Sequence, residues 1–174
     1  MKNNKIKTKH DLTNIRIVLD RSGSMAGSES VTTKALNAYL TDLKSEDGVN
    51  ALLTLSTFDS RSIDIPISKV PISKIYSFPD DLIKPRGGTP LYDAIGLAIH
   101  DLENIIESSE DNKVLVIVTD GYENASREYT FAEIRSKIKE KEEAGWLIIY
   151  LGADHDAFRQ ADSLNFNRER SMKY

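Results

Sequence analysis

The chain has 174 residues, a formal net charge of -4 at pH 7 and no cysteine. This length suits one domain whose core needs no crosslinks, and the lack of cysteine excludes disulfides and thiolate metal sites. The negative net charge gives no basis for a nucleic-acid-binding surface, so we expect no nucleic-acid partner.

Residues 1–14 are predicted to form a basic arm, and residues 15–174 a single domain. The lysines of the arm, which we interpret as solvated, are Lys2, Lys5, Lys7 and Lys9. No apolar stretch of signal-peptide length precedes Ile15, and no stretch is long enough to span a membrane. We therefore expect a cytoplasmic protein without a membrane partner.

A short apolar run from Ile15 to Leu19 is interrupted only by Arg16 and ends in the sequence Asp-Arg-Ser-Gly-Ser. This pattern predicts a buried strand followed by a loop. From Ser30, apolar residues recur at helical spacing up to a stop at Gly48. The apolar side of this predicted helix consists of Val31, Ala35, Leu36, Tyr39, Leu40 and Leu43.

Residues 51–58 are rich in Leu and Thr, and residues 63–67 alternate isoleucine with other residues after a turn-like sequence. Together they predict a β-hairpin. Pro66 has no N–H to donate, so the second arm should lie at the edge of a sheet. Residues 68–88 contain three prolines and no lasting period, which predicts a long connection with room for a short helix.

A second helix is expected after Thr89, whose hydroxyl suits the N-cap, with Pro90 at the first helical position. Its predicted buried face consists of Leu91, Ala94, Ile95, Ala98, Ile99, Leu102 and Ile106. The continuous apolar run 114–118 follows and is typical of a strand that is covered on both faces.

The remaining chain is predicted to add a third helix, a strand and a short last helix. Thr130 and Glu133 have the spacing of a capping box, and Gly145 is a suitable helix stop. Residues 146–151 form the next predicted strand, and residues 156–164 the last helix.

This order of elements predicts an α/β fold with a doubly wound sheet. Strands that alternate with helices imply a mostly parallel sheet with helices on both faces, and the hairpin adds one antiparallel edge strand. Ligands bind such sheets at the carboxyl ends of the strands. Asp20 and Asp120 each follow a predicted strand, and right-handed connections make those two strands neighbours. We therefore expect the two loops to share one crevice.

Side-chain oxygens from three loops would reach this crevice. Asp20, Ser22 and Ser24 alternate along the first loop, while Thr89 and Asp120 come from two others. An oxygen set without imidazole or thiolate favours Mg²⁺, with Mn²⁺ or Ca²⁺ as alternatives. Two carboxylates and neutral hydroxyls leave such a cation short of negative charge, so it would seek an anionic oxygen from outside.

Each stretch also has a purely structural interpretation. The pattern Asp-x-Ser-x-Ser arises by chance in roughly one chain of this composition in ten. Thr89 could serve only as a helix cap, and Asp120 could belong to an ordinary turn. The positions of the stretches favour the metal site, because two follow buried strands and the third opens a helix.

Residues near the crevice are interpreted in two groups. Asp59 is read as a turn residue, and Asp93 as a complement to the helix N-terminus. Tyr122 and Glu123 directly follow Asp120 and could line the rim of the site, where they would tune the choice of partner.

Three segments resemble the von Willebrand factor A domain and its metal-ion-dependent adhesion site: VLDRSGSM at 18–25, GGTPL at 87–91 and VTDG at 118–121. The segments 123–126 and 150–153 are similar to compact intracellular members in bacteria and their phages. The resemblance covers roughly residues 15–160. It implies a Rossmann-like fold, in which the family's common sixth strand would here be missing or very short.

The resemblance also implies a non-enzymatic role. Asp20, Ser22, Ser24, Thr89 and Asp120 would be the metal-site residues, some directly and some through water. The bound magnesium ion would take a Glu or Asp carboxylate of a partner protein at its vacant position. The oligomeric state stays open.

Other functions fit the sequence less well. A strand-end aspartate with magnesium can attack phosphate, but that class of phosphohydrolase carries a second acid two residues later, where this chain has Ser22. A nucleotide-binding module would need a Walker or Gly-x-Gly-x-x-Gly pattern, which the sequence lacks. A structural component whose loops no longer bind metal is a further alternative.

Overall fold

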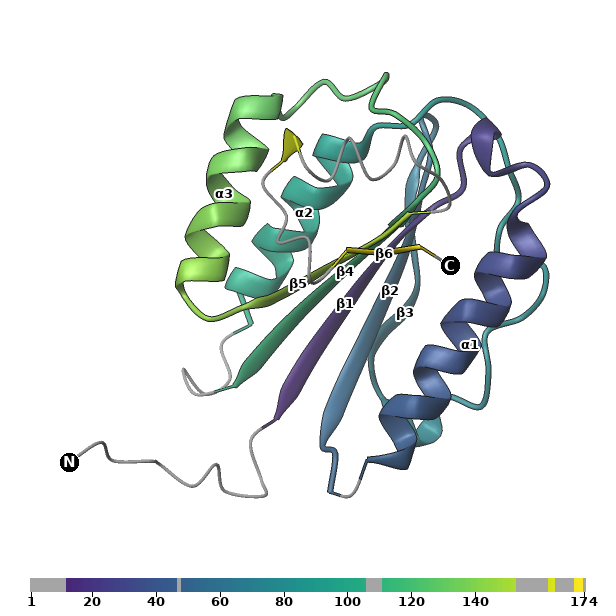
Figure 1. Ribbon diagram of the computed structural model, residues 1–174, viewed down its shortest axis with the longest axis vertical. Helices are drawn as coiled ribbons and strands as arrows, with labels where there is room; N and C mark the ends of the chain where they lie inside the picture. The colour runs from purple at the N-terminus through teal and green to yellow at the C-terminus, as the bar shows by residue number, and fades with distance from the viewer. Residues whose placement is uncertain (1–11, 47, 106–110, 153–162, 165–170, 174) are drawn as a thin grey trace.

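The computed structural model describes residues 12–46, 48–105, 111–152, 163–164 and 171–173. It contains a six-stranded sheet in the order β3-β2-β1-β4-β5-β6, between helices on both faces (Figure 1). Only the β2–β3 pair is antiparallel. This confirms the predicted α/β class with a mostly parallel sheet and one antiparallel edge. The strands are β1 (Thr13–Asp20), β2 (Ala51–Phe58), β3 (Ile63–Pro71), β4 (Asn112–Thr119), β5 (Leu147–Gly152) and β6 (Ser171–Lys173).

The central strand β1 lies between β2 and β4, so it is paired on both edges. Ile17 lies opposite Leu55 on one side and Val116 on the other. The direct pairing of β1 with β4 confirms that the two strands are neighbours. Because they run parallel, the residues that follow them emerge at the same end of the sheet.

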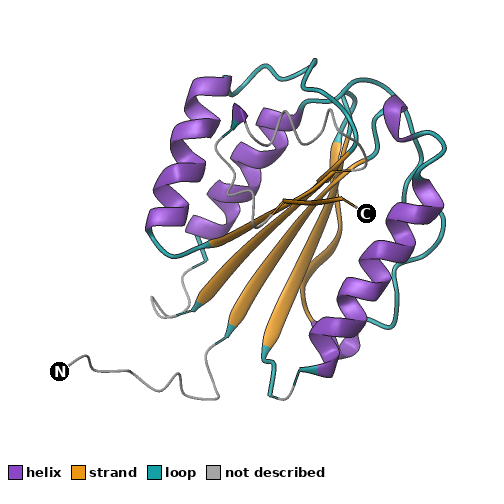
Figure 2. Cartoon of the chain, in the orientation of Figure 1, coloured by secondary structure: helices purple, strands orange, loops and turns teal. Residues whose placement is uncertain are grey.

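Helices and sheet form three layers (Figure 2). Helix α1 (Glu29–Ser45) covers one face, and α2 (Leu91–Glu103) and α3 (Phe131–Glu143) cover the other. In α1 the buried residues are Thr32, Thr33, Leu36 and Leu40. Val31 is 54% exposed, so its predicted place on the apolar side is wrong: the helix turns two threonines inward instead.

The start of α2 differs from the prediction. The helix begins at Leu91 with Pro90 as its N-cap residue, so the expectation that Thr89 caps the helix is wrong. Pro90 has a non-helical ψ of 65°, and the N–H of Tyr92 donates instead to Glu123 Oε2 at 3.0 Å. A side chain of a distant loop therefore caps α2, and the Thr89 hydroxyl is not used as the cap. The predicted inner face is otherwise confirmed by the buried residues Leu91, Ala94, Ile95, Ala98, Ile99 and Leu102.

The capping box of Thr130 and Glu133 opens α3, and Gly145 follows its end with a φ of 91°. Strand β3 lies at the sheet edge as predicted, but it extends to Pro71 and leads into a 3₁₀ helix, Ile72–Lys74. The predicted connection is therefore shorter than residues 68–88.

A short sixth strand does form: β6 pairs parallel with β5 over three residues. The first residues of the predicted arm, 1–11, lie outside the described residues, as do Ile106 and positions 156–162 of the predicted last helix. Among the helices that the structure describes, none has the length and apolar character needed to cross a membrane.

Candidate metal centre

The first loop of the site begins where β1 ends. Asp20 is completely buried, and its Oδ1 accepts a hydrogen bond of 2.6 Å from the backbone N–H of Ser22. The chain then forms a 3₁₀ turn, Gly23–Met25, and the hydroxyl oxygens of Ser22 and Ser24 lie 3.0 Å apart. The tight turn thus gathers one carboxylate and two hydroxyls at the carboxyl end of the central strand.

Gly121 brings the other two loops to the same place. A Cβ atom added at Gly121 would lie 2.8 Å from Ser24 Oγ and 3.3 Å from Thr89 Oγ1. Gly121 directly follows Asp120, so all three loops meet around this glycine. Because glycine has no side chain, the two hydroxyls can approach its Cα closely, and any larger residue would have to push the Ser24 hydroxyl aside.

Hydrogen bonds of backbone N–H groups hold the loop of Thr89 in position. The N–H of Gly23 donates to the carbonyl of Gly87 at 3.0 Å. The N–H of Thr89 donates to Asn124 Oδ1 at 2.8 Å, and the N–H of Asn124 donates to the carbonyl of Thr89 at 3.1 Å. Thr89 is therefore tied to the loop after β4, and its loop to the loop after β1.

Burial dominates the electrostatics of Asp20. It raises the pKa of this carboxyl to about 6, although hydrogen bonds from Thr119 and Ser22 act to lower it. The nearby charge of Asp120 raises the pKa further. A buried carboxylate with a second one close by is destabilised as an anion, and a cation placed between them would relieve this.

Asp120 has an unused buried oxygen. Its Oδ2 accepts a hydrogen bond of 3.2 Å from the Ser28 hydroxyl. Its Oδ1 is buried, and none of the described residues provides a hydrogen-bond partner for it. Buried acceptors are rarely left unpaired, so this atom fits a bound cation.

The donor set consists of the carboxylates of Asp20 and Asp120 and the hydroxyls of Ser22, Ser24 and Thr89. Such oxygen ligands suit hard cations such as Mg²⁺. Within the described ranges, no cluster of three or more His, Cys, Asp or Glu side chains is arranged to hold a metal ion. Hydroxyl oxygens would therefore have to complete the coordination, as the sequence pattern predicts.

Ion pairs around the buried Asp59 support the site from the side. Asp59 Oδ2 accepts hydrogen bonds from Arg21 Nε at 2.6 Å and from Arg86 Nε at 2.8 Å. Burial acts to raise the pKa of Asp59, but hydrogen bonds from Arg86, the Arg61 N–H and Arg21 outweigh it and lower the value to about 2. Arg21 belongs to the first loop and Arg86 precedes the Gly-Gly-Thr loop. Asp59 is thus a structural turn residue, as predicted. It also connects the two loops through Arg21 and Arg86.

The other residues considered near the crevice, Asp93, Tyr122 and Glu123, have separate roles. Asp93 is the acidic residue in the first turn of α2, as predicted, and its Oδ1 also accepts N–H bonds of 2.9 Å from Glu128 and Tyr129, which orders the loop before α3. The half-buried Glu123 side chain caps α2, and its place at the rim stays a prediction. Tyr122 is 49% exposed and does lie at the surface beside Asp120.

Sequence reasoning missed three residues that hold the site residues in place. Thr119 donates to Asp20, Ser28 donates to Asp120, and Asn124 pairs with the backbone of Thr89. Thr119 adjoins Asp120 and ends the strand that pairs with β1, a position that could have indicated its contact with Asp20. The other two residues carry no comparable signal.

Comparisons with known proteins identify solved structures with a similar fold. No protein-family model and no curated protein sequence matches the chain. A similar solved structure is the SpRpn10 VWA domain, with 13% identity over 92% of this chain and 85% of that chain and a TM-score of 0.60. Another is the vWF domain of the type V pili tip protein Mfa5 from Porphyromonas gingivalis, with 11% identity over 94% and 89% and a TM-score of 0.62.

A third similar structure is proximal thread matrix protein 1 from the mussel byssus. It shares 15% identity with this chain at a TM-score of 0.63, and the match covers 95% of this chain but only 42% of the mussel protein. At these identities the likeness concerns the fold. The chain therefore shares the Rossmann-like fold of von Willebrand factor A domains.

Proposed function

We propose that this chain is a von Willebrand factor A domain that binds a protein partner through a divalent cation, Mg²⁺ or else Mn²⁺ or Ca²⁺. The residues that would hold the cation are Asp20, Ser22, Ser24, Thr89 and Asp120. The fold of the similar structures supports a protein-interaction module. The observation that carries the metal site is the unpaired buried oxygen of Asp120, next to Gly121, where the hydroxyls of Ser24 and Thr89 converge.

The surroundings of Asp20 favour an external anion as a further ligand. Both of its carboxylate oxygens already accept hydrogen bonds, from the Ser22 N–H and the Thr119 hydroxyl, which reduces the negative charge available to a metal. The three hydroxyls add none. A cation bound here would supply an electron-poor coordination position that attracts the carboxylate of a Glu or Asp residue of the partner.

The sequence after Asp20 favours binding over phosphoryl chemistry. The position two residues later, which would hold the second acid of a phosphohydrolase, is Ser22. A phosphatase screen with Mg²⁺ that detects turnover abolished by Asp20→Asn would overturn this choice.

The proposal also covers the cellular location of the protein and a further contact with its partner. A chain without cysteine suits a reducing compartment, and we propose a cytoplasmic location like that of the compact bacterial and phage members it resembles. Tyr122, exposed beside Asp120, would contact the partner around the captured carboxylate.

Affinity capture tests the proposed partner binding. The immobilised chain is incubated with extract of its source cells in Mg²⁺ and then washed with EDTA, and the released proteins are identified. We expect a partner that EDTA releases and that an Asp20→Ala chain does not retain. Partners that stay bound in EDTA and also bind Asp20→Ala would reject the metal-dependent mechanism.

A further inference from the structure

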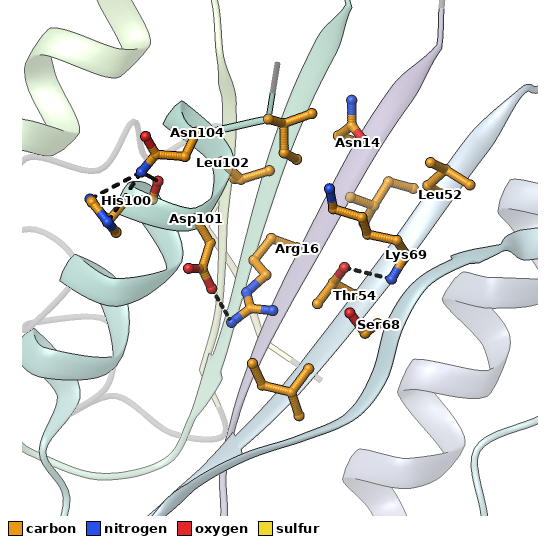
Figure 3. A pocket seen from close by; sticks show the side chains of 13 residues that line it. Asn14, Arg16, Leu52, Thr54, Ser68, Lys69, His100, Asp101, Leu102 and Asn104 are labelled. Carbon is orange, nitrogen blue, oxygen red and sulfur yellow. Dashed lines mark hydrogen bonds and ion pairs between the residues drawn. The ribbon is translucent and has the colours of Figure 1, made fainter. Parts of the chain in front are cut away.

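A second hollow lies at the opposite end of the sheet from the metal centre. It has a volume of about 620 Å³, within the range of roughly 300–1,000 Å³ that is common for small-molecule sites. Its walls come from β1, β2, β3 and the end of α2 (Figure 3). Asn14 at this end and Asp20 at the other are separated by about 20 Å of strand, so the two sites are distinct.

The hollow exists because one part of the sheet face has no helix over it. Helices α2 and α3 lie over β1, β4 and β5, while the segment between β3 and α2 packs into the core on the face of α1. This segment contributes Ile72, Ile75, Phe78 and Ile83 to that core. On the side of α2, Phe58 at the end of β2 is buried in the core of that helix, whereas Leu52 and Thr54 near its beginning are only half-buried, and this part of the face borders the hollow.

Two buried donors at the wall lack acceptors. The Arg16 side chain is 3% exposed, and its Nη2 donates to Asp101 Oδ2 at 2.9 Å. Its Nε has no hydrogen-bond partner in the described part of the chain, and the same holds for Nδ2 of Asn14, a residue that is 2% exposed. Figure 3 shows Arg16 between Asp101 on α2 and Thr54 on β2. Unpaired buried donors are rare in proteins, so these point to an acceptor supplied from outside.

A β-bulge adds a cation at the rim. Leu53 pairs with Val70 and Leu55 with Ile67, so Thr54 alone opposes two residues, Ser68 and Lys69. Lys69 has a φ of 50°, the one positive φ of a non-glycine residue among those described, and its N–H donates to Thr54 Oγ1 at 3.0 Å. Bulges re-aim side chains, and strained backbone is concentrated at functional sites. Here the bulge places the exposed Lys69 at the hollow.

The charges and apolar groups of the hollow indicate the ligand class. Two cations, Arg16 and Lys69, and one carboxylate, Asp101, leave one net positive charge, which matches a singly charged anion better than a dianionic phosphate. The apolar lining residues are Leu52, Ile65, Leu102 and Ile105. We propose that this hollow binds a small organic carboxylate with an apolar body. The carboxylate accepts from Lys69 and from the donors of Arg16 and Asn14, and the apolar body lies against Ile65 and Leu102.

Nuclear magnetic resonance with ¹⁵N-labelled protein tests this site. Benzoate and hexanoate serve as probes, with benzamide and hexanamide as uncharged controls of similar shape. We expect the carboxylates to give saturable shifts at the Asn14 side-chain amide and the Arg16 Nε–H, with a Kd on the order of 1 mM, and the amides to bind about tenfold more weakly. EDTA and Asp20→Ala should leave these shifts unchanged, which separates this site from the metal centre.

Single substitutions test whether the Lys69 ammonium group binds the carboxylate. Lys69→Met should weaken benzoate binding about fivefold or more, whereas Lys84→Met, which removes a lysine that is 73% exposed and lies outside the hollow, should not. The proposal is wrong if neither carboxylate gives saturable shifts at Asn14 and Arg16, if the amides bind equally well, or if Lys69→Met has no effect. If neither benzoate nor hexanoate binds but a short Glu-containing peptide shifts the same signals, the proposal is also wrong. The hollow would then be assigned to a protein partner.

Discussion

The Thr119 hydroxyl donates a hydrogen bond of 2.6 Å to Asp20 Oδ2, between residues 99 positions apart in the sequence. This buried bond joins the ends of β1 and β4 and holds Asp20, one of the proposed metal ligands. It lowers the pKa of a carboxyl that burial raises. Thr119 therefore helps to keep Asp20 in the ionised form that a cation requires.

Removal of this donor should weaken metal binding in a pH-dependent way. Thr119→Val keeps the shape of the side chain but deletes a hydrogen bond to a charged group, which is worth about 1.5 kcal/mol, or roughly one pKa unit. We expect Mg²⁺ affinity to fall about fivefold at pH 6 and little at pH 8, where Asp20 is largely ionised in both proteins. Calorimetric titration measures this, with Thr41→Val on the exposed side of α1 as the matched control. Equal loss at both pH values would contradict the role given to Thr119.

Metal affinity of the unchanged protein should itself depend on pH. Burial raises the pKa of Asp20 to about 6 without metal, so this carboxyl stabilises the fold at low pH and that contribution is lost as the pH rises through 6. A bound cation reverses the preference because it needs the ionised form. We expect the Mg²⁺ binding constant to fall about tenfold per pH unit below pH 6 and to level off above pH 7. Titrations from pH 5 to 8 would show a flat profile if Asp20 were not a ligand.

A methyl group at Gly121 should displace the Ser24 hydroxyl from the proposed metal centre. The added Cβ of Gly121→Ala would lie 2.8 Å from Ser24 Oγ, the end of an exposed side chain that can move aside. We expect Mn²⁺ binding, followed by electron paramagnetic resonance, to be lost while the melting temperature in EDTA changes little.

Gly145→Ala provides the opposite control for this substitution. Its new Cβ meets no atom within 4 Å, but the residue has a φ of 91°, so the fold should lose about 1 kcal/mol while Mn²⁺ binding is kept. Normal Mn²⁺ binding by Gly121→Ala would place the cation elsewhere.

The ion pairs of the buried Asp59 should contribute to the response to acid. Its pKa is lowered to about 2 in the fold, so its stabilising contribution is present above pH 4 and is lost as the pH falls through 2. We expect Asp59→Asn to reduce the free energy of unfolding at pH 7 by about 2 kcal/mol and to flatten its change between pH 4 and 2. Urea titrations at several pH values measure this, with Asp42→Asn on the exposed side of α1 as control. An unchanged acid response would show that the pairs contribute nothing.

Much of the fold could be predicted because periodicity and connection rules act locally. The apolar runs of β1 and β4 and the right-handed connection were enough to place these strands side by side. The end of β3 could not be predicted, because the bulge at Ser68 and Lys69 breaks the alternation on which strand prediction depends. Helix α1 was misread at Val31, because its inner face contains two buried threonines.

The candidate site likewise contains residues that the sequence predicts and residues that it does not. Asp20, Ser22 and Ser24 alternate within one short loop, so their convergence could be read from spacing. Thr119, Ser28 and Asn124 act through contacts with residues 35 to 99 positions away, and such pairs leave no periodic trace in one sequence. The hollow beside Arg16 could not be predicted either, since it depends on which face of the sheet the segment after β3 covers.

The most direct test of the central claim asks whether a metal at Asp20 accepts a carboxylate from outside. Mn²⁺ is added to the protein with ¹³C-labelled acetate as a model of a Glu or Asp side chain, and the line width of the carboxylate signal is recorded against free Mn²⁺ at equal concentration. We predict that the acetate signal is broader with protein and Mn²⁺ than with Mn²⁺ alone, and that EDTA reverses the broadening. With Asp20→Ala, the line width should not exceed that with Mn²⁺ alone. Bound Mn²⁺ that leaves the acetate signal sharp, or broadening that persists in Asp20→Ala, would contradict the proposal.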